Sequence, residues 1–250
     1  MNPRLETAPP GPATRLDLFW SKELLKGFPL AAFDNPNYGY GFFDDFTDGL
    51  PTGKYTATQA TTGTFALGDA LGGVALVDCD SSTVVQGINV QLGGTAGEMF
   101  KPAANKIIIF TARLKFVDTA SGPEFFVGLH ETDTTIIGTS ALTGSNYVGY
   151  SSVTDDKVLL SCAAKAGAAS TDTGTTMVED TYKLLEFRIN GVTSIEFFVD
   201  GSKVTAASFA TAYVPIVEMR PSIVCQSDGA VDTIVHLDGW GCWVSDTTRA

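Results

Sequence analysis

The segment YKLLEFRINGVTSIEFFVDGSKV, residues 182–204, decides the fold because it encodes two successive β-hairpins. Leu185, Phe187 and Ile189 alternate with polar residues, which is the period of a half-buried antiparallel strand. After an Asn-Gly break, the run SIEFFVD repeats this alternation. The pair Asp200-Gly201 then offers two residues that tolerate a positive φ, as a type I′ turn requires. We therefore predict antiparallel strands on both sides of these two turns.

The composition favours an all-β protein. Thr, Val, Gly and Phe are frequent, and long helix-forming tracts of Ala, Leu, Glu and Lys are missing. The net charge is −12, and no window gathers enough Lys and Arg to follow a phosphate backbone, so we expect no nucleic-acid partner. No run reaches the ~18 apolar residues of a membrane span, and the chain does not open on a secretory signal. We expect no membrane contact, and synthesis in a reducing cytoplasm.

Short strands separated by turn residues follow one another from residue 55, at the spacing of a β-sandwich. We expect them at 55–59, 64–67, 73–78, 84–92, 107–117, 124–130, 147–150, 158–163, 218–225 and 231–244. The clearest strand is 107–117, whose polar side chains Thr111, Arg113 and Lys115 we expect on the solvent face. The segment 164–178 is small and polar, and we expect an exposed loop there.

Residues 1–41 read as an extended N-terminal arm ahead of a sandwich domain at 42–250. The arm begins with polar, Pro-rich sequence that suits an extended backbone, and Ser21 could cap a short helix that ends at Gly27. The arm also carries large apolar side chains that need burial: Leu16, Leu18, Phe19, Trp20, Leu24, Leu25, Phe28 and Phe33. These residues either wrap the arm onto its own domain or dock it on another subunit. The sequence leaves both arrangements open.

No constellation of residues dictates a chemistry. His130-Glu131 lacks the second His that a zinc protease helix needs, and neither His130 nor His236 lies near a strained Gly-x-Ser-x-Gly turn. The four cysteines, at 79, 162, 225 and 242, are too widely spaced for a zinc knuckle or a small disulfide scaffold. We expect them to be buried thiols. We predict no enzyme, no catalytic residue and no cofactor.

The sequence offers partial patterns for three further kinds of site. A glycosidase needs two carboxylates on one strand face, and Glu186 or the pair Glu196 and Asp200 comes nearest to that pattern. A glycan-degrading enzyme would depend on a carboxylate such as Glu131 or Glu186. Acidic pairs at predicted loop tips leave a structural calcium site open without predicting one; they are Asp44-Asp45 with Asp48, Asp78 with Asp80, Asp155-Asp156 and Glu179-Asp180. Aromatic residues near predicted loops could stack on a sugar, namely Tyr147, Tyr150 and Tyr213, whereas Trp240 and Trp243 belong to an apolar strand and are expected in the core.

Several segments together resemble a group of bacteriophage virion proteins. They are the Pro-rich arm, the Asp-Asp-Phe run at 44–46, the strand KIIIFTARLKF, the segment EFFVGLHETDTT and the hairpin IEFFVDGSKV. Those proteins are laminin-G-like or concanavalin-like β-sandwiches that serve as capsid decoration (cement) proteins or as modules of tail and head fibres. The resemblance covers about residues 42–244. It implies an all-β fold, an antiparallel β-sandwich or jelly roll.

The same resemblance implies a function. The chain would be a non-enzymatic virion protein, synthesised in the host bacterial cytoplasm and located on the capsid surface, with the major capsid protein as its partner. It would form a homo-oligomer, a trimer or a dimer, and would bridge capsomers through the eight apolar arm residues and the sandwich loops. The alternative implied by the resemblance is a carbohydrate- or receptor-binding module of a tail or head fibre, with a glycan as its ligand.

Overall fold

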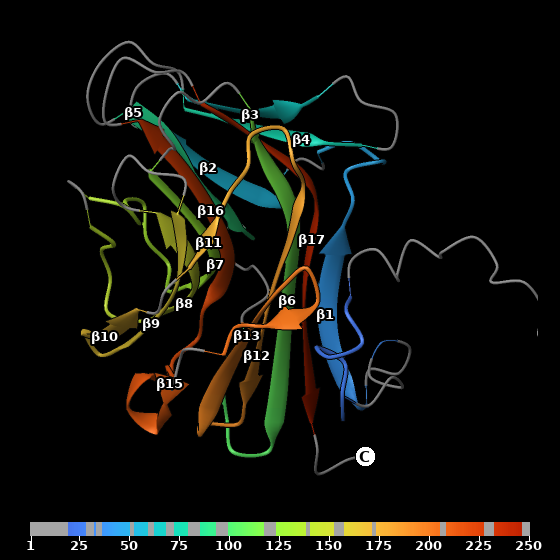
Figure 1. Ribbon diagram of the computed structural model, residues 1–250, viewed down its shortest axis with the longest axis vertical. Coiled ribbons are helices and arrows are strands. Elements are labelled where there is room, and N and C mark those ends of the chain that lie inside the picture. Colours follow the sequence, from blue (N-terminus) through green and yellow to red (C-terminus); the bar gives the residue numbers. More distant parts are fainter. Residues whose placement is uncertain are drawn as a thin grey trace, which may run out of the picture.

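The computed structural model shows two antiparallel β-sheets packed face to face, which confirms the predicted all-β sandwich (Figure 1). It describes residues 20–28, 33, 37–50, 53–59, 63–68, 73–79, 86–93, 100–117, 124–138, 141–152, 158–171, 174–205, 209–227 and 233–246. In this part of the chain the helical conformations are the 3₁₀ turn η1, Thr211–Tyr213, and the single residue Phe33. No helix there is long and apolar enough to cross a membrane.

The first sheet, sheet A, has the strand order β14-β13-β12-β6-β17-β4-β3, with β1 beside β17 and β15 beside β13. Its strands are β1 Gly39–Asp44, β3 Thr64–Leu67, β4 Ala75–Asp78, β6 Lys106–Val117, β12 Lys183–Asn190, β13 Ser194–Val199, β14 Ser202–Lys203, β15 Phe209–Ala210 and β17 Ile234–Asp246. Because β1 begins at Gly39, the first sandwich strand spans the boundary expected between residues 41 and 42.

The second sheet, sheet B, has the order β10-β9-β8-β7-β16-β5-β2, with β11 beside β9. Its strands are β2 Tyr55–Gln59, β5 Gln86–Leu92, β7 Glu124–His130, β8 Tyr147–Ser152, β9 Val158–Lys165, β10 Ala168–Thr171, β11 Thr175–Thr176 and β16 Arg220–Ser227. All its pairings are antiparallel. The ten strands expected from residue 55 onward are therefore present, with ends shifted by at most three residues.

The two hairpins predicted at residues 182–204 are confirmed, whereas the exposed loop expected at residues 164–178 is wrong. Asp200 and Gly201 have φ values of 50° and 74°, as the predicted type I′ turn needs. The segment 164–178 is not an open loop, because it turns back at Ala166-Gly167, again with positive φ, and forms β10 and β11 against β9. An edge strand such as β10, exposed on its outer side, shows no apolar alternation, so the sequence pattern misses it.

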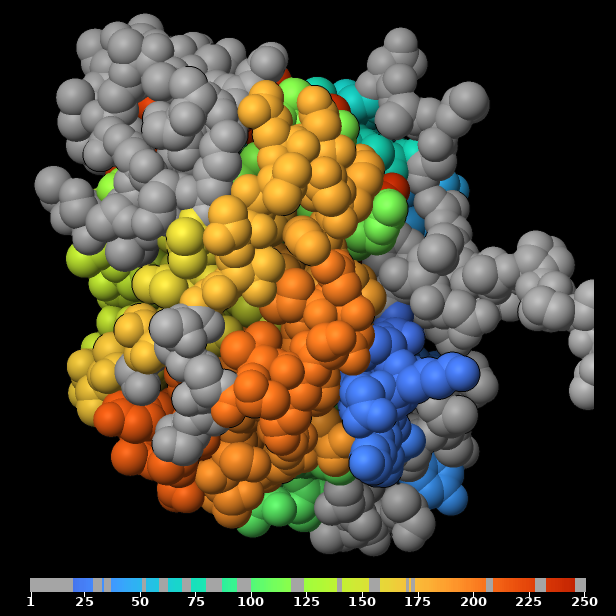
Figure 2. Space-filling view, viewed as in Figure 1, coloured from blue at the N-terminus to red at the C-terminus, as the bar shows by residue number. Residues whose placement is uncertain are grey.

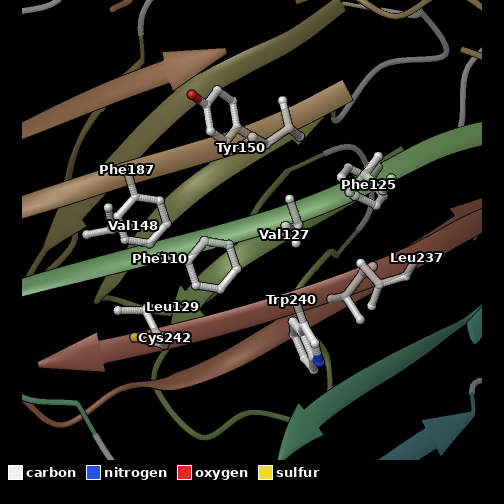
Figure 3. Packing of buried hydrophobic residues seen from close by; sticks show 14 of the residues in the cluster. Phe110, Phe125, Val127, Leu129, Val148, Tyr150, Phe187, Leu237, Trp240 and Cys242 are labelled. Carbon is white, nitrogen blue, oxygen red and sulfur yellow. The ribbon is translucent and has the colours of Figure 1, made fainter. Parts of the chain in front are cut away.

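Aromatic side chains from both sheets fill the space between them (Figure 3). Phe110 of β6 and Phe187 of β12 stack with ring centroids 4.8 Å apart, and Trp240 of β17 is fully buried, as expected. Tyr150 of β8 crosses this core, and its hydroxyl donates a hydrogen bond to the Phe198 carbonyl at 2.8 Å. That bond ties sheet B to the β12–β13 hairpin of sheet A.

The outer face of sheet A departs from the expected pattern. Ile109 and Thr111 of β6 are both fully buried although they point away from the core between the sheets. The expectation that Thr111 faces water is therefore wrong. The physical reason is that a second layer of chain covers this part of the sheet, and the covering layer is the N-terminal arm.

We predict that Phe110→Ala destabilises the protein by about 3–5 kcal/mol, because it removes a buried ring and leaves a cavity at the centre of the sandwich. Leu67→Ala, on the edge strand β3 with 46% of the side chain exposed, is the matched control and should change stability by about 0.5 kcal/mol or less. Urea unfolding of both variants measures the difference. Equal losses of stability would contradict the core described above.

Candidate binding surface at the docked arm

Residues 20–28 form a tight run of turns rather than a helix. The Leu24 amide donates to Ser21 Oγ at 3.2 Å, and the Leu25 amide donates to the Ser21 carbonyl at 3.1 Å. Gly27 has a φ of 72°, which ends the run. Ser21 and Gly27 thus stand in the capping and stopping positions that the sequence indicated for them.

Three arm side chains pack against the outer face of sheet A. Figure 2 shows the blue arm lying against the orange β12–β13 hairpin. Trp20, Leu24 and Phe28 each expose 4% or less of their surface. Their buried neighbours on the sheet are Ile109 of β6 and Phe198 of β13. The arm therefore buries an apolar face of its own against an apolar patch of the sheet. We call this patch of sheet A, formed by Ile109 and Phe198, the docking face.

The aromatic packing continues through Phe33 and the last strand. The Phe33 ring lies 5.6 Å from Trp20 and 5.0 Å from Trp243 of β17. Gly241, two residues before Trp243, makes room for the indole of Trp20, because a Cβ there would lie 3.2 Å from that ring. Trp243 is only partly buried, and it packs against the arm. The expectation from the sequence that it lies in the core between the sheets is therefore wrong.

Two charged residues of β12 anchor the ends of the arm turn. Glu186 and Arg188 are two positions apart, so they point out of the same face of the sheet. Glu186 Oε1 accepts a hydrogen bond from the Ser21 amide at 2.8 Å, and Arg188 Nη1 donates to the Lys26 carbonyl. A hydrogen-bond acceptor at the amino end and a cation at the carbonyl end satisfy free backbone groups at the two ends of the turn. The arm is thus held by two polar contacts as well as by apolar packing.

The carboxyl group of Glu186 is buried under the arm. Burial raises its pKa to about 7; hydrogen bonds from Ser21 oppose this rise and the charge of Asp200 adds to it. Its second oxygen, Oε2, is buried and has no hydrogen-bond partner among the described residues. A neutral carboxyl tolerates such a site better than a carboxylate does. Docking of the arm is therefore coupled to the protonation of Glu186.

The structure places five of the eight predicted arm residues. Trp20, Leu24 and Phe28 are buried, and Leu25 and Phe33 are partly buried, all against the chain's own sheet A. Leu16, Leu18 and Phe19 lie outside the described residues. Of the two arrangements that the sequence left open, the described part of the arm takes the intramolecular one. Binding of these residues to a partner stays a prediction, and it requires the arm to leave the docking face.

The outer face of sheet B is also covered, by the segment 131–146 between β7 and β8. Ile136 and Ile137 are buried there against Phe126 and Tyr147. The fully buried His130 ring lies parallel to Tyr147, with Nδ1 2.8 Å from the Glu131 carbonyl and Nε2 3.0 Å from the Thr143 carbonyl. His130 thus lies within hydrogen-bonding distance of both ends of the covering segment.

The carboxylates that the sequence singled out are held by structural contacts. Burial alone would raise the pKa of Glu131, but hydrogen bonds from Ser145 and Asn146 outweigh it and keep the pKa below its usual value. Glu131 follows a strand of sheet B, whereas Glu186 lies under the arm on sheet A, so the two cannot act on one glycosidic bond. The other two are paired with lysines, Glu196 with Lys203 at 2.6 Å and Asp200 with Lys183 at 2.6 Å.

The metal-binding and sugar-stacking residues considered from the sequence find little support among the described residues. No group of three or more His, Cys, Asp or Glu side chains that could hold a metal ion occurs among the described residues. Asp80, Asp155 and Asp156, members of the acidic pairs, lie outside them. Tyr147 and Tyr150 are buried, so they cannot stack on a sugar in this conformation; their hydroxyls point into protein, and burial raises the pKa of Tyr147 to about 12. Tyr213 is partly exposed.

A pocket of about 260 Å³ opens at the edge of sheet A. It arises because β14 and β15 pair with opposite ends of β13 and leave the middle of that strand uncovered. Its lining combines the apolar side chains Ile195, Phe197 and Phe209 with the Glu196–Lys203 ion pair. No signal in the sequence pointed to this pocket, because the two short strands that frame it lack an alternating pattern.

No protein-family model matches the chain, and no curated protein matches it at a significant level. Solved structures do. A protein of unknown function from Shewanella oneidensis MR-1 superposes with a TM-score of 0.58 and 14% identity, over 96% of this chain and 98% of that chain. Peanut lectin gives 0.54 and 10%, over 82% and 97%. A carbohydrate esterase from the Shiga toxin-encoding bacteriophage phi24B gives 0.50 and 14%, over 82% and 96%.

These likenesses establish the fold as a concanavalin-like, lectin-type β-sandwich or jelly roll. A phage protein is among the proteins that share it. The same architecture occurs in a lectin and in an enzyme, so the fold alone is compatible with binding and with catalysis.

We predict that the arm docks more tightly at acidic than at alkaline pH. In a released arm, Glu186 would titrate near 4.5, whereas in the docked state it titrates near 7. The docked state thus binds the proton more tightly, so this stabilisation is complete below about pH 4.5 and is lost as the pH rises through about 7, a change of up to ~3 kcal/mol. Hydrogen exchange of the amides at residues 21–28, corrected for intrinsic rates, should show lower protection at about pH 8 than at about pH 5.

Glu186→Gln is the matched variant, since the amide cannot titrate and keeps most of the shape. Its arm protection should not change between the two pH values. If the wild type also shows no change, Glu186 does not govern docking.

Proposed function

We propose that this protein is a non-enzymatic structural component of a bacteriophage virion, a decoration protein that binds the outer surface of the capsid shell through its N-terminal arm. The resemblance described for the sequence suggests the virion. The observation that carries the proposal is the arm itself, an apolar segment that packs on the outside of a complete sandwich. Trp20, Leu24 and Phe28 rest on the docking face without belonging to either sheet.

The contacts of the arm are suited to exchange between partners. They consist of side-chain packing and two polar anchors from β12, with no strand pairing described between residues 20–28 and the sheet. Release would uncover apolar surface on the arm and on the docking face at once. Each could then pair with a capsid subunit or with a neighbouring copy, so that one protein links two subunits. The net charge of −12 would assist approach to a basic partner surface.

The arrangement of the described carboxylates supports a binding role rather than catalysis. Glu186 supports the arm, Glu131 fastens the segment over sheet B, and Glu196 is paired with Lys203. The outer face of each sheet is at least partly occupied by the chain's own residues. A shell-binding protein needs a rigid body and adhesive segments and requires no catalytic groove, which agrees with this distribution.

A second candidate is a carbohydrate-binding module of a tail or head fibre. The likeness to peanut lectin and the pocket at the edge of β13 favour it. That pocket places the charged pair Glu196 and Lys203 beside apolar side chains, a combination that can hold a sugar through hydrogen bonds and ring contacts. The proposal and this candidate differ in which surface binds, so variants can separate them.

We predict that the full-length protein decorates capsids and that Trp20→Ala/Leu24→Ala/Phe28→Ala lowers this binding at least tenfold. The reason is that the three side chains supply most of the apolar surface of residues 20–28. Lys22→Ala/Glu23→Ala is the matched control, because both side chains are exposed in the same turn, and it should bind like the wild type. Co-sedimentation with capsids lacking the protein measures binding, and unfolding curves confirm that each variant is folded.

Full occupancy of capsids by the folded triple variant would overturn the role of the arm. Cryo-microscopy of virions that locates the chain on a tail or fibre, or not in the particle, would overturn the capsid assignment itself. Binding to a glycan array that is lost in Tyr213→Ala or in Lys203→Ala and kept in the triple arm variant would favour the carbohydrate-binding module.

A further inference from the structure

Two cysteines meet at the corner where the sheets approach each other. Cys79 directly follows β4 of sheet A, and Cys225 lies in β16 of sheet B; both are fully buried in the core between the sheets. The two thiols donate hydrogen bonds to the same acceptor, the carbonyl oxygen of Thr233, at 3.1 Å from Cys79 Sγ and 3.6 Å from Cys225 Sγ. This shared acceptor places the two sulfur atoms close together.

The geometry sets an upper limit on their separation. The distance between the two sulfur atoms cannot exceed the sum of their distances to the Thr233 carbonyl oxygen, which are 3.1 Å and 3.6 Å. Disulfides join residues whose Cα atoms are about 4.4–6.8 Å apart, whereas packed sheets usually lie about 10 Å apart. Here residues of β4 and β16 come within 8 Å of each other, Cα to Cα, so the two sheets approach more closely where these strands meet than face-to-face packing alone would bring them. A disulfide requires both side chains to rotate away from Thr233 until the sulfurs meet.

The other two cysteines have different surroundings. Cys162 of β9 lies on the opposite face of sheet B, beneath the segment 131–146, and donates to the Gly149 carbonyl at 3.3 Å. Cys242 of β17 lies beside Phe42 and Phe110 in the middle of sheet A. All four cysteines fall within the described part of the chain, and in this state each is a thiol.

We propose that Cys79 and Cys225 form an inter-sheet disulfide when the folded protein meets a peroxide oxidant. One thiolate attacks the peroxide oxygen, which breaks the O–O bond and gives a sulfenic acid and water; the second thiol then displaces the sulfenic oxygen as a second water molecule. The two sulfurs together lose two electrons and two protons, and one hydrogen peroxide is reduced to two water molecules. The bond links sheet A to sheet B and closes the chain between residues 79 and 225, which constrains the unfolded state.

The burial of both thiols determines how fast this happens. A peroxide reaches them only when the corner opens locally, so oxidation is slow compared with that of an exposed thiol. A protein made in a reducing cytoplasm would thus leave it as a dithiol and gain its cross-link afterwards. A protein that is released into an oxidising medium within a particle would be strengthened after assembly, without interference with folding. The inference itself does not depend on the virion assignment.

The test is to treat the full-length protein, purified under reducing conditions, with hydrogen peroxide, and then to alkylate the thiols in denaturant. We expect the number of alkylated thiols to fall from four to two per chain. Peptide mapping without reductant should show residues 79 and 225 joined, with the loss of two hydrogen atoms. The melting temperature should rise by several degrees and return to its starting value after reduction.

Cys79→Ser and Cys225→Ser should each abolish the link and the rise in melting temperature. Cys162→Ala and Cys242→Ala are matched controls, because both replace buried thiols, and they should keep the link. Mapping of the wild type decides the question even if a variant fails to fold. Four remaining thiols after treatment of the native protein and after refolding with the oxidant would overturn the proposal, as would a different pair, a link between chains, or thiol loss without a linked peptide.

Discussion

The pairing of β12 with β6 and β13 is the interaction on which the arm site depends. Its register sets Glu186 beside Thr111 and Phe198, and Arg188 beside Ile109. Because side chains alternate along a strand, all of these residues point out of the sandwich. A slip of one residue would send Glu186 into the core and Phe187 into the solvent. The same register that builds the core therefore also builds the surface on which the arm rests.

Both sheets carry apolar side chains on their outer faces. Apolar side chains on the outer face of a sheet must be covered, and sheet A uses the arm for this purpose while sheet B uses the segment 131–146. The two covers are fastened differently. Sheet A holds its cover through Glu186 and Arg188, whereas sheet B holds its cover through His130 and Glu131. The raised pKa of Glu186 predicts that the cover of sheet A weakens as the pH rises, whereas the lowered pKa of Glu131 predicts that the cover of sheet B weakens in acid.

The lectin-type fold does not by itself select a function. It is shared with a lectin, an esterase and a protein of unknown function, all at 14% identity or less. What distinguishes this chain is how its polar groups are used. The described carboxylates with perturbed pKa values support covering segments or pair with lysines, and such groups perturb pKa values without catalysis. The proposed binding role of the arm rests on this arrangement.

The sequence by itself determined the strands and turns whose cause is local. Alternation predicted β6, β12 and β13, and Asp200-Gly201 predicted its hairpin, because side-chain period and permitted φ values belong to neighbouring residues. It missed β10 and β11, which are short edge strands without alternation. It indicated an apolar arm with a cap at Ser21, yet left open what the arm would contact.

Only the tertiary structure decided which outer positions are covered. Thr111 looked exposed because nothing near it in the chain covers it; the arm does so from a distance. Tyr147 is covered by the segment that directly precedes it, residues 131–146, whose packing over sheet B no local pattern showed. Glu186 became a buried acid for the same reason. Cys79 and Cys225, far apart in the chain, became neighbours because β4 and β16 meet at one corner of the sandwich. Contacts between distant segments depend on how whole sheets pack, and no local pattern encodes that packing.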